Sequence, residues 1–227
     1  MSERGAVAVD DITRTFGRGR TATAALRGVS FSVEPGQLVA LRGRSGSGKT
    51  TLLNIVGGLD RPDSGQVRVA DQDVTAMSEQ ERLRLRRTSV AFIFQSFGLI
   101  PILSAAENVG VPLRIAGIGA RDREERVRLM LDIVGLAGHA KQRPGELSGG
   151  QQQRVAIARA LASSPTVLLA DEPTGQLDSE TAKQIMRLLR TVVQSEGVTA
   201  LVATHDPNLI SIADSVLELA DGKIKDD

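Results

Sequence analysis

The sequence contains no cysteine, no tryptophan and no tyrosine, and only five phenylalanines in 227 residues. The absence of cysteine excludes disulfides and thiolate metal sites and fits a reducing compartment such as the cytoplasm. The scarcity of aromatic rings removes the stacking platforms that single-strand nucleic-acid binders use. With 28 basic and 27 acidic residues the formal net charge is +1, so no overall field attracts nucleic acid or an anionic membrane. The composition therefore predicts no nucleic-acid partner.

Long apolar runs are also missing. No stretch approaches the roughly 18 consecutive apolar residues of a membrane span, and the N-terminal residues MSERGAVAVDD lack the apolar core of a signal peptide. We therefore expect a cytoplasmic chain whose role at a membrane depends on another chain. A length of 227 residues with 41% hydrophobic residues suits a single domain over residues 1–227.

The pattern of apolar residues predicts an α/β fold. Residues 6–12, 29–33 and 66–70 alternate apolar with polar residues between turn signals, which indicates a β-rich N-terminal part. Residues 104–162 show helical periodicity.

Two unbroken apolar runs then follow, at 166–170 and 198–203, with a helical stretch at 179–194 between them. Continuous apolar strands that alternate with helices indicate a parallel sheet covered on both faces.

The strongest local signal is GRSGSGKT at residues 43–50, which matches the phosphate-loop pattern G-x-x-x-x-G-K-[ST]. Glycines allow backbone N–H groups to turn inward around a phosphate, Lys49 can reach the β- and γ-phosphates, and the Thr50 hydroxyl can bind Mg²⁺. A glycine-rich turn with a solvated lysine is the alternative. The apolar strand before the loop and the helical run after it favour phosphate binding.

Two acidic residues, Asp171 and Glu172, directly follow the apolar run TVLLA. Open α/β sheets bind ligands at the carboxyl ends of their strands. Asp171 is therefore placed to hold Mg²⁺ and Glu172 to orient or deprotonate an attacking water. Alone, two acids after a strand often only cap the next helix; with the phosphate loop upstream, the joint interpretation is favoured.

A third motif, LSGGQ at residues 147–151, precedes a helical pattern. Ser148 and the two glycines offer a hydroxyl and exposed N–H groups at a helix N-terminus, which makes a second phosphate cradle. A plain helix cap is the alternative. One chain has no use for two cradles on one γ-phosphate unless the second serves a neighbouring chain.

The order of the motifs resembles the nucleotide-binding domain of ATP-binding-cassette (ABC) proteins. The phosphate loop at 43–50, Gln95, LSGGQ at 147–151, LLADEPTGQLD at 168–178 and His205 follow one another as in that family. The resemblance implies a RecA-like P-loop NTPase with a parallel-sheet core, an N-terminal antiparallel β subdomain and an α-helical signature subdomain at about 96–162. It also implies hydrolysis of ATP with Mg²⁺ as cofactor.

The resemblance further implies residue roles. Phe16 matches the adenine-stacking aromatic, Gln95 the glutamine that touches Mg²⁺ and the attacking water, Asp178 the aspartate at the dimer interface, and His205 the histidine that contacts the γ-phosphate. The implied catalytic residues are Glu172, His205, Gln95 and Lys49, and the implied metal ligands are Thr50, Gln95 and Asp171. The implied nucleotide-binding residues are Phe16, Gly43, Ser45, Gly46, Ser47, Gly48, Lys49, Thr50, Thr51, Ser148, Gly149, Gly150, Gln151 and Asp178.

Several of these residues have a structural alternative. Phe16 could be simple core, Gln95 an ordinary polar residue at a strand end, and Asp178 the N-cap of the helix that begins near Ser179. The other histidine, His139, belongs to no motif, and we expect it to face solvent.

The segment FQSFGLIPILSAAENVGVPL at 94–113 resembles the MacB/LolD branch, which serves lipoprotein release and macrolide export. The resemblance implies a homodimer with ATP sandwiched between the phosphate loop and LSGGQ. It also implies a MacB/FtsX-type permease with about four spans and a large extracytoplasmic domain, and hence a location on the inner face of the cell membrane. Residues 95–101, with Phe97 and Leu99, are the expected landing surface for that permease.

A soluble ABC ATPase without a permease is the second hypothesis. Translation factors of the family carry two cassettes in one chain, and structural-maintenance proteins insert a long coiled coil between the motifs; neither pattern fits this sequence. A regulatory GTPase or kinase would lack a guanine-reading motif and leave LSGGQ unexplained.

Overall fold

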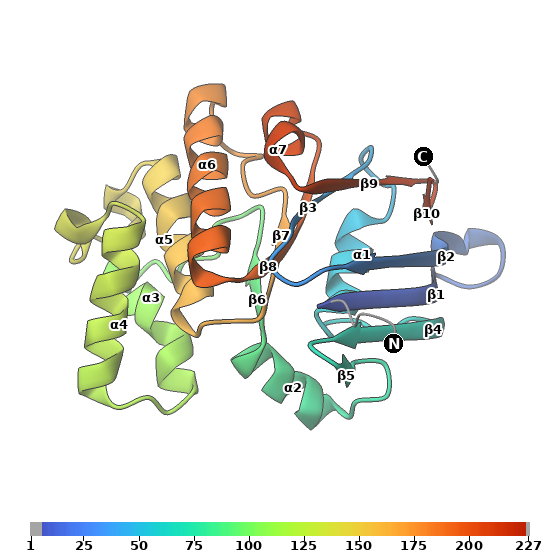
Figure 1. Cartoon of the computed structure of the whole chain (residues 1–227), viewed down its shortest axis with the longest axis horizontal. Helices are drawn as coiled ribbons and strands as arrows, with labels where there is room; N and C mark the ends of the chain where they lie inside the picture. Colours follow the sequence, from blue (N-terminus) through green and yellow to red (C-terminus); the bar gives the residue numbers. More distant parts are fainter. Residues whose placement is uncertain (1–5, 226–227) are drawn as a thin grey trace.

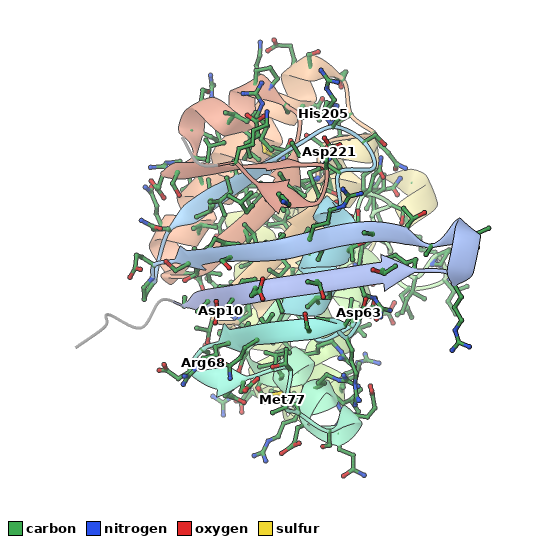
Figure 2. All side chains as sticks on the ribbon, turned by 90° about the vertical axis from the view of Figure 1, so that its right-hand side faces the viewer. Asp10, Asp63, Arg68, Met77, His205 and Asp221 are labelled. Carbon is green, nitrogen blue, oxygen red and sulfur yellow. The ribbon has the colours of Figure 1, made fainter. Side chains whose placement is uncertain are left out.

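The computed structural model describes residues 6–225, which form two sheets and the helices that cover them (Figure 1). The first sheet is antiparallel, with the strand order β2-β1-β4-β5. Its strands are β1 (Val7–Phe16), β2 (Thr23–Val33), β4 (Ser64–Val69) and β5 (Gln72–Asp73). Figure 2 views this sheet face-on, with Asp10 of β1 and Arg68 of β4 on neighbouring strands.

The second sheet has six strands in the order β10-β9-β3-β8-β7-β6. Neighbouring strands from β9 to β6 run parallel, whereas β10 joins β9 antiparallel. The strands are β3 (Leu38–Arg42), β6 (Val90–Ile93), β7 (Val167–Asp171), β8 (Thr199–Thr204), β9 (Ser215–Ala220) and β10 (Lys223–Ile224). All residues of β8 are buried, as expected for a parallel strand with both faces covered.

Helices cover both faces of the six-stranded sheet. The helices are α1 (Lys49–Val56), α2 (Glu79–Thr88), α3 (Ala105–Ile115), α4 (Ala120–Ile133), α5 (Gly149–Ala162), α6 (Ser179–Glu196) and α7 (Pro207–Ile212). In β7, Val167 and Leu169 join the apolar core shared with α1, while Leu168 and Ala170 join the core shared with α5 and α6. Successive side chains of a strand point to opposite faces, so α1 and α5 lie on opposite sides of the sheet (Figure 1).

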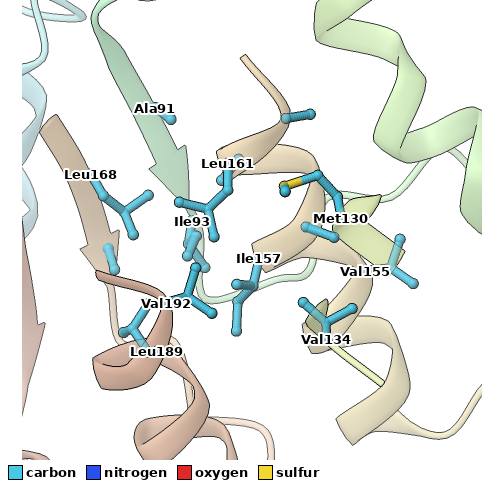
Figure 3. Packing of buried hydrophobic residues seen from close by; sticks show 14 of the residues in the cluster. Ala91, Ile93, Met130, Val134, Val155, Ile157, Leu161, Leu168, Leu189 and Val192 are labelled. Atoms are coloured by element: carbon cyan, nitrogen blue, oxygen red, sulfur yellow. The ribbon is translucent and has the colours of Figure 1, made fainter. Parts of the chain in front are cut away.

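Helices α3, α4 and α5 pack together beside the sheet. Figure 3 shows Ile157 of α5 among Val134, which follows α4, and Leu189 and Val192 of α6, with Ile93 of β6 behind. This layer places the N-terminus of α5 beside the sheet, away from α1.

The carboxyl ends of four adjacent parallel strands meet at one edge of the sheet. The loop at 43–50 follows β3, His205 follows β8, Glu172 follows β7, and Gln95 lies two residues after β6. The order β3-β8-β7-β6 thus gathers residues that are far apart in the sequence, as in other open α/β sheets.

The structure confirms the predicted fold class: an α/β protein with an N-terminal antiparallel sheet, a parallel core and helices. Within residues 6–225, no helix has both the length and the apolar character required to cross a membrane.

Candidate active site

The loop at 43–50 wraps tightly between β3 and α1. Gly46 and Gly48 have positive φ angles, 78° and 106°, which glycine adopts without a steric penalty. A Cβ atom on Gly48 would lie 2.5 Å from the carbonyl oxygen of Ala25, so a larger residue would collide with β2. Gly48 also offers no side chain to cap α1. The first N–H groups of this helix are therefore available to an anion.

Ser47 and Lys49 are polar side chains buried within this loop. The hydroxyl of Ser47 is buried without a hydrogen-bond partner. The ammonium of Lys49 donates to the carbonyl oxygens of Gly43 at 2.8 Å and Arg44 at 3.3 Å. Because buried polar groups are normally satisfied, the unpaired hydroxyl indicates that the loop is built to receive a polar ligand.

Glu172 stands at the centre of the site between two cationic or proton-bearing groups. Its Oε1 lies 3.5 Å from Nζ of Lys49, and its Oε2 lies 2.9 Å from Nδ1 of His205. Its backbone has a φ of 47°, a left-handed conformation that costs a non-glycine residue about 1–3 kcal/mol. The Glu172 N–H donates to the Ala203 carbonyl at 2.9 Å, which holds the strained residue in place. Such strain is concentrated at functional sites.

The predicted metal ligands also lie together. The Thr50 hydroxyl donates to Oδ2 of Asp171 at 2.6 Å, and the Gln95 side chain lies beside Gly175 on the same pocket wall. Hydroxyl, carboxylate and amide oxygens are hard ligands that suit Mg²⁺, which usually completes its shell with water and substrate phosphate. Residues 6–225 contain no cluster of three or more His, Asp or Glu able to hold a metal alone. The donor set therefore fits a Mg²⁺ ion that arrives with a phosphate.

Most of the predicted site residues line one pocket of 650 Å³. Its lining residues are Phe16, Ala25, Gly43, Arg44, Ser45, Gly46, Gly48, Lys49, Thr50, Thr51, Gln95, Asp171, Glu172 and His205. Ser47 lines an adjoining hollow of 640 Å³ on the other side of the loop, together with His205 and Asp221, which Figure 2 labels side by side.

Phe16 lies at the rim of the pocket rather than in the core. Its side chain is 44% exposed, which argues against the structural alternative. The guanidinium of Arg14 lies 4.8 Å from the ring centroid, a distance typical of a cation–π contact. Asp60 and Asp63 hold Arg14 through hydrogen bonds of 2.9–3.1 Å. The ring is thus fixed beside the phosphate loop with part of its surface free to stack on a base.

We expect Phe16→Ala to weaken ATP binding roughly tenfold, because stacking of a base on an aromatic ring contributes about 1–3 kcal/mol. The maximal rate should change little, since the ring lies away from Glu172. Equilibrium titration with ATP measures the first effect and saturation kinetics the second. Phe16→Tyr keeps the ring and is the control. An unchanged affinity in Phe16→Ala would contradict base stacking.

The residues of LSGGQ are not brought to this pocket. Ser148 is the N-cap of α5: its hydroxyl accepts from the Gln151 N–H at 3.2 Å, and Oε1 of Gln151 accepts from the Ser148 N–H at 2.9 Å. This reciprocal arrangement is a capping box. None of residues 148–151 lines the pocket that contains Lys49.

Asp178 also lies outside the pocket. Its Oδ1 accepts from the N–H groups of Glu180 and Thr181, so it caps α6. Hydrogen bonds from Thr181, first from its side chain and then from its backbone, and from Glu180 lower the pKa of Asp178. The capping role considered from the sequence is therefore present, and a role at a dimer interface stays a prediction.

The expectation that His139 faces solvent is wrong. Its Nε2 lies 3.0 Å from Nε2 of Gln151, and its Nδ1 is buried without a hydrogen-bond partner. The sequence also gave no reason to select Arg159 of α5, which donates to the carbonyl oxygens of Phe97 and Gly98 at 3.0 and 2.5 Å. Burial lowers the pKa of the Arg159 guanidinium. These contacts depend on tertiary packing, which no short motif records.

The fold and the pocket together define a P-loop NTPase, because a glycine-rich phosphate loop, a strand-end acid pair and a metal-compatible donor set share one sheet edge. The ABC transporter family model matches residues 26–175. The lipoprotein-releasing system ATP-binding protein LolD 1 of Rhodospirillum rubrum is 46% identical over 219 residues, which are 96% of this chain and 97% of that protein. The chain belongs to the ABC transporter family.

Further relatives agree with this assignment. The macrolide export ATP-binding/permease protein MacB of Syntrophobacter fumaroxidans is 47% identical over 96% of this chain, but the match covers only 31% of that protein. The chain thus spans about a third of the length of such MacB relatives. The dimeric structure of the ATP-binding cassette MJ0796 with ADP and Pi has a TM-score of 0.88 at 39% identity, covering 97% of both chains. The protein is an ABC-type ATPase of the MacB/LolD type.

Proposed function

We propose that residues 1–227 form a single ABC ATPase domain, with a helical subdomain at about 96–162, which works as a homodimer. Each dimer drives a membrane permease from the cytoplasmic face of the cell membrane. The observation that carries this proposal is the position of Glu172, which contacts both Lys49 and His205 beside the phosphate loop.

Within one chain, ATP binds with its base on Phe16 and its phosphates on the loop. The hydroxyls of Ser45, Ser47 and Thr51 and the N–H groups of Gly43, Gly46 and Gly48 are placed to surround these phosphates. Lys49 releases the carbonyls of Gly43 and Arg44 and turns to the β- and γ-phosphates. In its present position it already blocks the mouth of the loop.

Hydrolysis then depends on the groups at the strand ends. Mg²⁺, held by Thr50 and Asp171 with Gln95 nearby, neutralises charge that develops on the phosphates. Glu172 orients a water molecule and accepts its proton. His205 donates its Nδ1 proton to Glu172, which keeps the carboxylate oriented, and its exposed ring is free to reach the γ-phosphate.

The second cradle supports a dimer in which each chain completes the other's site. Ser148, Gly149, Gly150 and Gln151 lie outside the pocket of their own chain, and α5 lies on the face of the sheet opposite α1. A two-fold dimer would place each cradle over the partner's phosphate loop, with Asp178 at the interface. The dimeric state of MJ0796 supports this arrangement.

The surface next to Gln95 supports a permease partner. Asn108 is fully buried and fixes the preceding loop, since its Oδ1 accepts from the Ile100 N–H and its Nδ2 donates to the carbonyls of Ile100 and Leu103. This loop exposes 76% of Ile102. A groove of 390 Å³ lies between α3 and α4, with Ala106, Gly110 and Val127 on its walls. An exposed apolar side chain beside a groove suits an amphipathic helix of another protein.

The landing surface is therefore better tested at Ile102 than at Phe97 or Leu99. Phe97 is half-buried and lies close to Gly149, and Leu99 packs against the larger apolar core. A charge at either position would disturb the cassette itself.

We expect Ile102→Glu to reduce co-purification with a four-span permease and permease-dependent stimulation of ATPase at least tenfold, because a buried contact would have to accommodate a charge. Basal ATPase of the isolated chain should stay within about threefold of normal. Leu83→Glu on α2 is the matched control, since Leu83 is 43% exposed and distant from the groove. Normal stimulation of Ile102→Glu would place the docking surface elsewhere.

If no permease is recovered with the wild-type chain, the soluble ABC ATPase becomes the better account. The LolD and MacB names of its relatives favour a permease, with about four spans and a large extracytoplasmic domain. The same permease would hold the chain at the inner face of the membrane.

A further inference from the structure

We infer that His139 is a positioning residue for hydrolysis: its neutral ring accepts a hydrogen bond from Gln151 and holds the signature turn, residues 147–151, in its capped form. The inference rests on the proposed function, in which this turn completes the partner's nucleotide site.

The direction of the His139–Gln151 hydrogen bond follows from the capping box. Oε1 of Gln151 accepts from the Ser148 N–H at 2.9 Å, and a backbone N–H can only donate. The other end of the same amide is therefore the NH₂ group, which can only donate as well. It lies 3.0 Å from Nε2 of His139, so this ring nitrogen must carry no proton and accept the bond.

The proton of the neutral ring then resides on Nδ1. This atom is buried without a hydrogen-bond partner. The protein thus leaves one donor unsatisfied while Nε2 stays available to Gln151. A group at position 139 that can only donate would face the amide NH₂, and rotation of that amide to repair the contact would break its bond with Ser148.

His139 is the polar member of a set of contacts that confine the signature turn. A Cβ on Gly150 would lie 2.5 Å from Cγ2 of Thr181, and a Cβ on Gly149 would lie 3.3 Å from Cδ2 of Leu177. Apolar and methyl groups thus restrict the two glycines from the α6 side. His139, in the short helix Ala137–His139, fixes the Gln151 side chain from another side. Loss of its acceptor would leave the turn capped but free to rotate the amide.

Four variants separate the acceptor from mere packing. His139→Gln places an amide oxygen at a similar reach and should keep the ATPase kcat within about threefold of wild type. His139→Met fills the space without an acceptor and should lower kcat about tenfold. His139→Lys can only donate and should lower kcat further. Combining His139→Lys with Gln151→Glu should restore much of the rate, because a carboxylate accepts from both Ser148 and the lysine.

The affinity of the monomer for ATP should be unchanged in all four variants, since Phe16 and Lys49 are untouched. A drop in kcat without a change in this affinity is the pattern expected of a positioning residue, whereas general unfolding lowers both. ¹⁵N NMR of labelled histidine provides a direct readout. The chain has two histidines, so His139→Gln assigns the signals, and His139 should show an unprotonated Nε2.

The inference is overturned by a protonated Nε2 at His139, or by a wild-type kcat in His139→Met while Ser148→Arg is inactive. If Ser148→Arg is itself fully active, the proposed use of the signature turn fails, and the inference fails with it. Wild-type-like His139→Gln together with slow His139→Met and a rescued double variant supports the inference.

Discussion

Replacing Glu172 with glutamine is expected to lower Mg-ATP turnover on the order of a thousandfold while leaving ATP binding intact. A general base contributes about 10²–10⁴-fold, and an amide cannot take up the proton of water. The amide oxygen can still accept from His205 and Lys49, which lie 2.9 and 3.5 Å from the carboxylate. The pocket should therefore keep its shape and close normally on the nucleotide.

Because closure is intact and hydrolysis is blocked, Glu172→Gln should accumulate as an ATP-bound dimer. Phosphate release measures the rate, and light scattering with Mg-ATP measures the mass in solution. Glu180→Gln on the first turn of α6 is a control that removes an exposed carboxylate paired with Lys183. Near-normal turnover in Glu172→Gln would remove this residue from its assigned role.

Ser148→Arg is expected to abolish hydrolysis, with a loss of at least a hundredfold, without weakening ATP binding to the monomer. Arginine removes the N-cap hydroxyl of α5 and fills the cradle with a long cationic side chain. Removal of one group that stabilises transition-state charge costs about 10²–10³-fold, and steric exclusion of the partner adds to this. The pocket that contains Lys49 does not include Ser148, so the affinity of the same chain should not change.

Equilibrium ATP binding and steady-state hydrolysis test the two halves of this prediction separately. Ser195→Arg, at an exposed position near the far end of α6, controls for the added charge and volume. A monomer of Ser148→Arg that binds ATP poorly would mean that the cradle serves its own chain.

The sequence was sufficient to predict the residues that gather at the sheet edge, for a physical reason. Gln95, Asp171 and His205 each lie within a short distance after an apolar run, and parallel strands bring their carboxyl ends to one edge. The glycine pattern at 43–50 adds a local backbone requirement that glycine alone meets easily. Local patterns and one topological rule thus predict the pocket.

The contacts between the parts could not be predicted in the same way. Arg14 reaches Phe16, Asp60 and Asp63 across two strands and a loop, and His139 meets Gln151 only because the short helix at 137–139 packs beside α5. No periodicity encodes such meetings. Helix α2 is a different case, since its capping box of Ser78 and Glu81 is a recognisable local signal.

The central claim is that two copies of this chain share each nucleotide site, and a mixing experiment tests it most directly. Lys49→Ala removes the ammonium from one half of a site, and Ser148→Arg blocks the other half. In a mixed dimer, one composite site carries both changes and the other carries neither. Each variant alone should be inactive, and an equimolar mixture should recover a measurable share of wild-type ATPase, provided one intact site suffices. A mixture as inactive as its components, although mixed dimers form, would contradict the account.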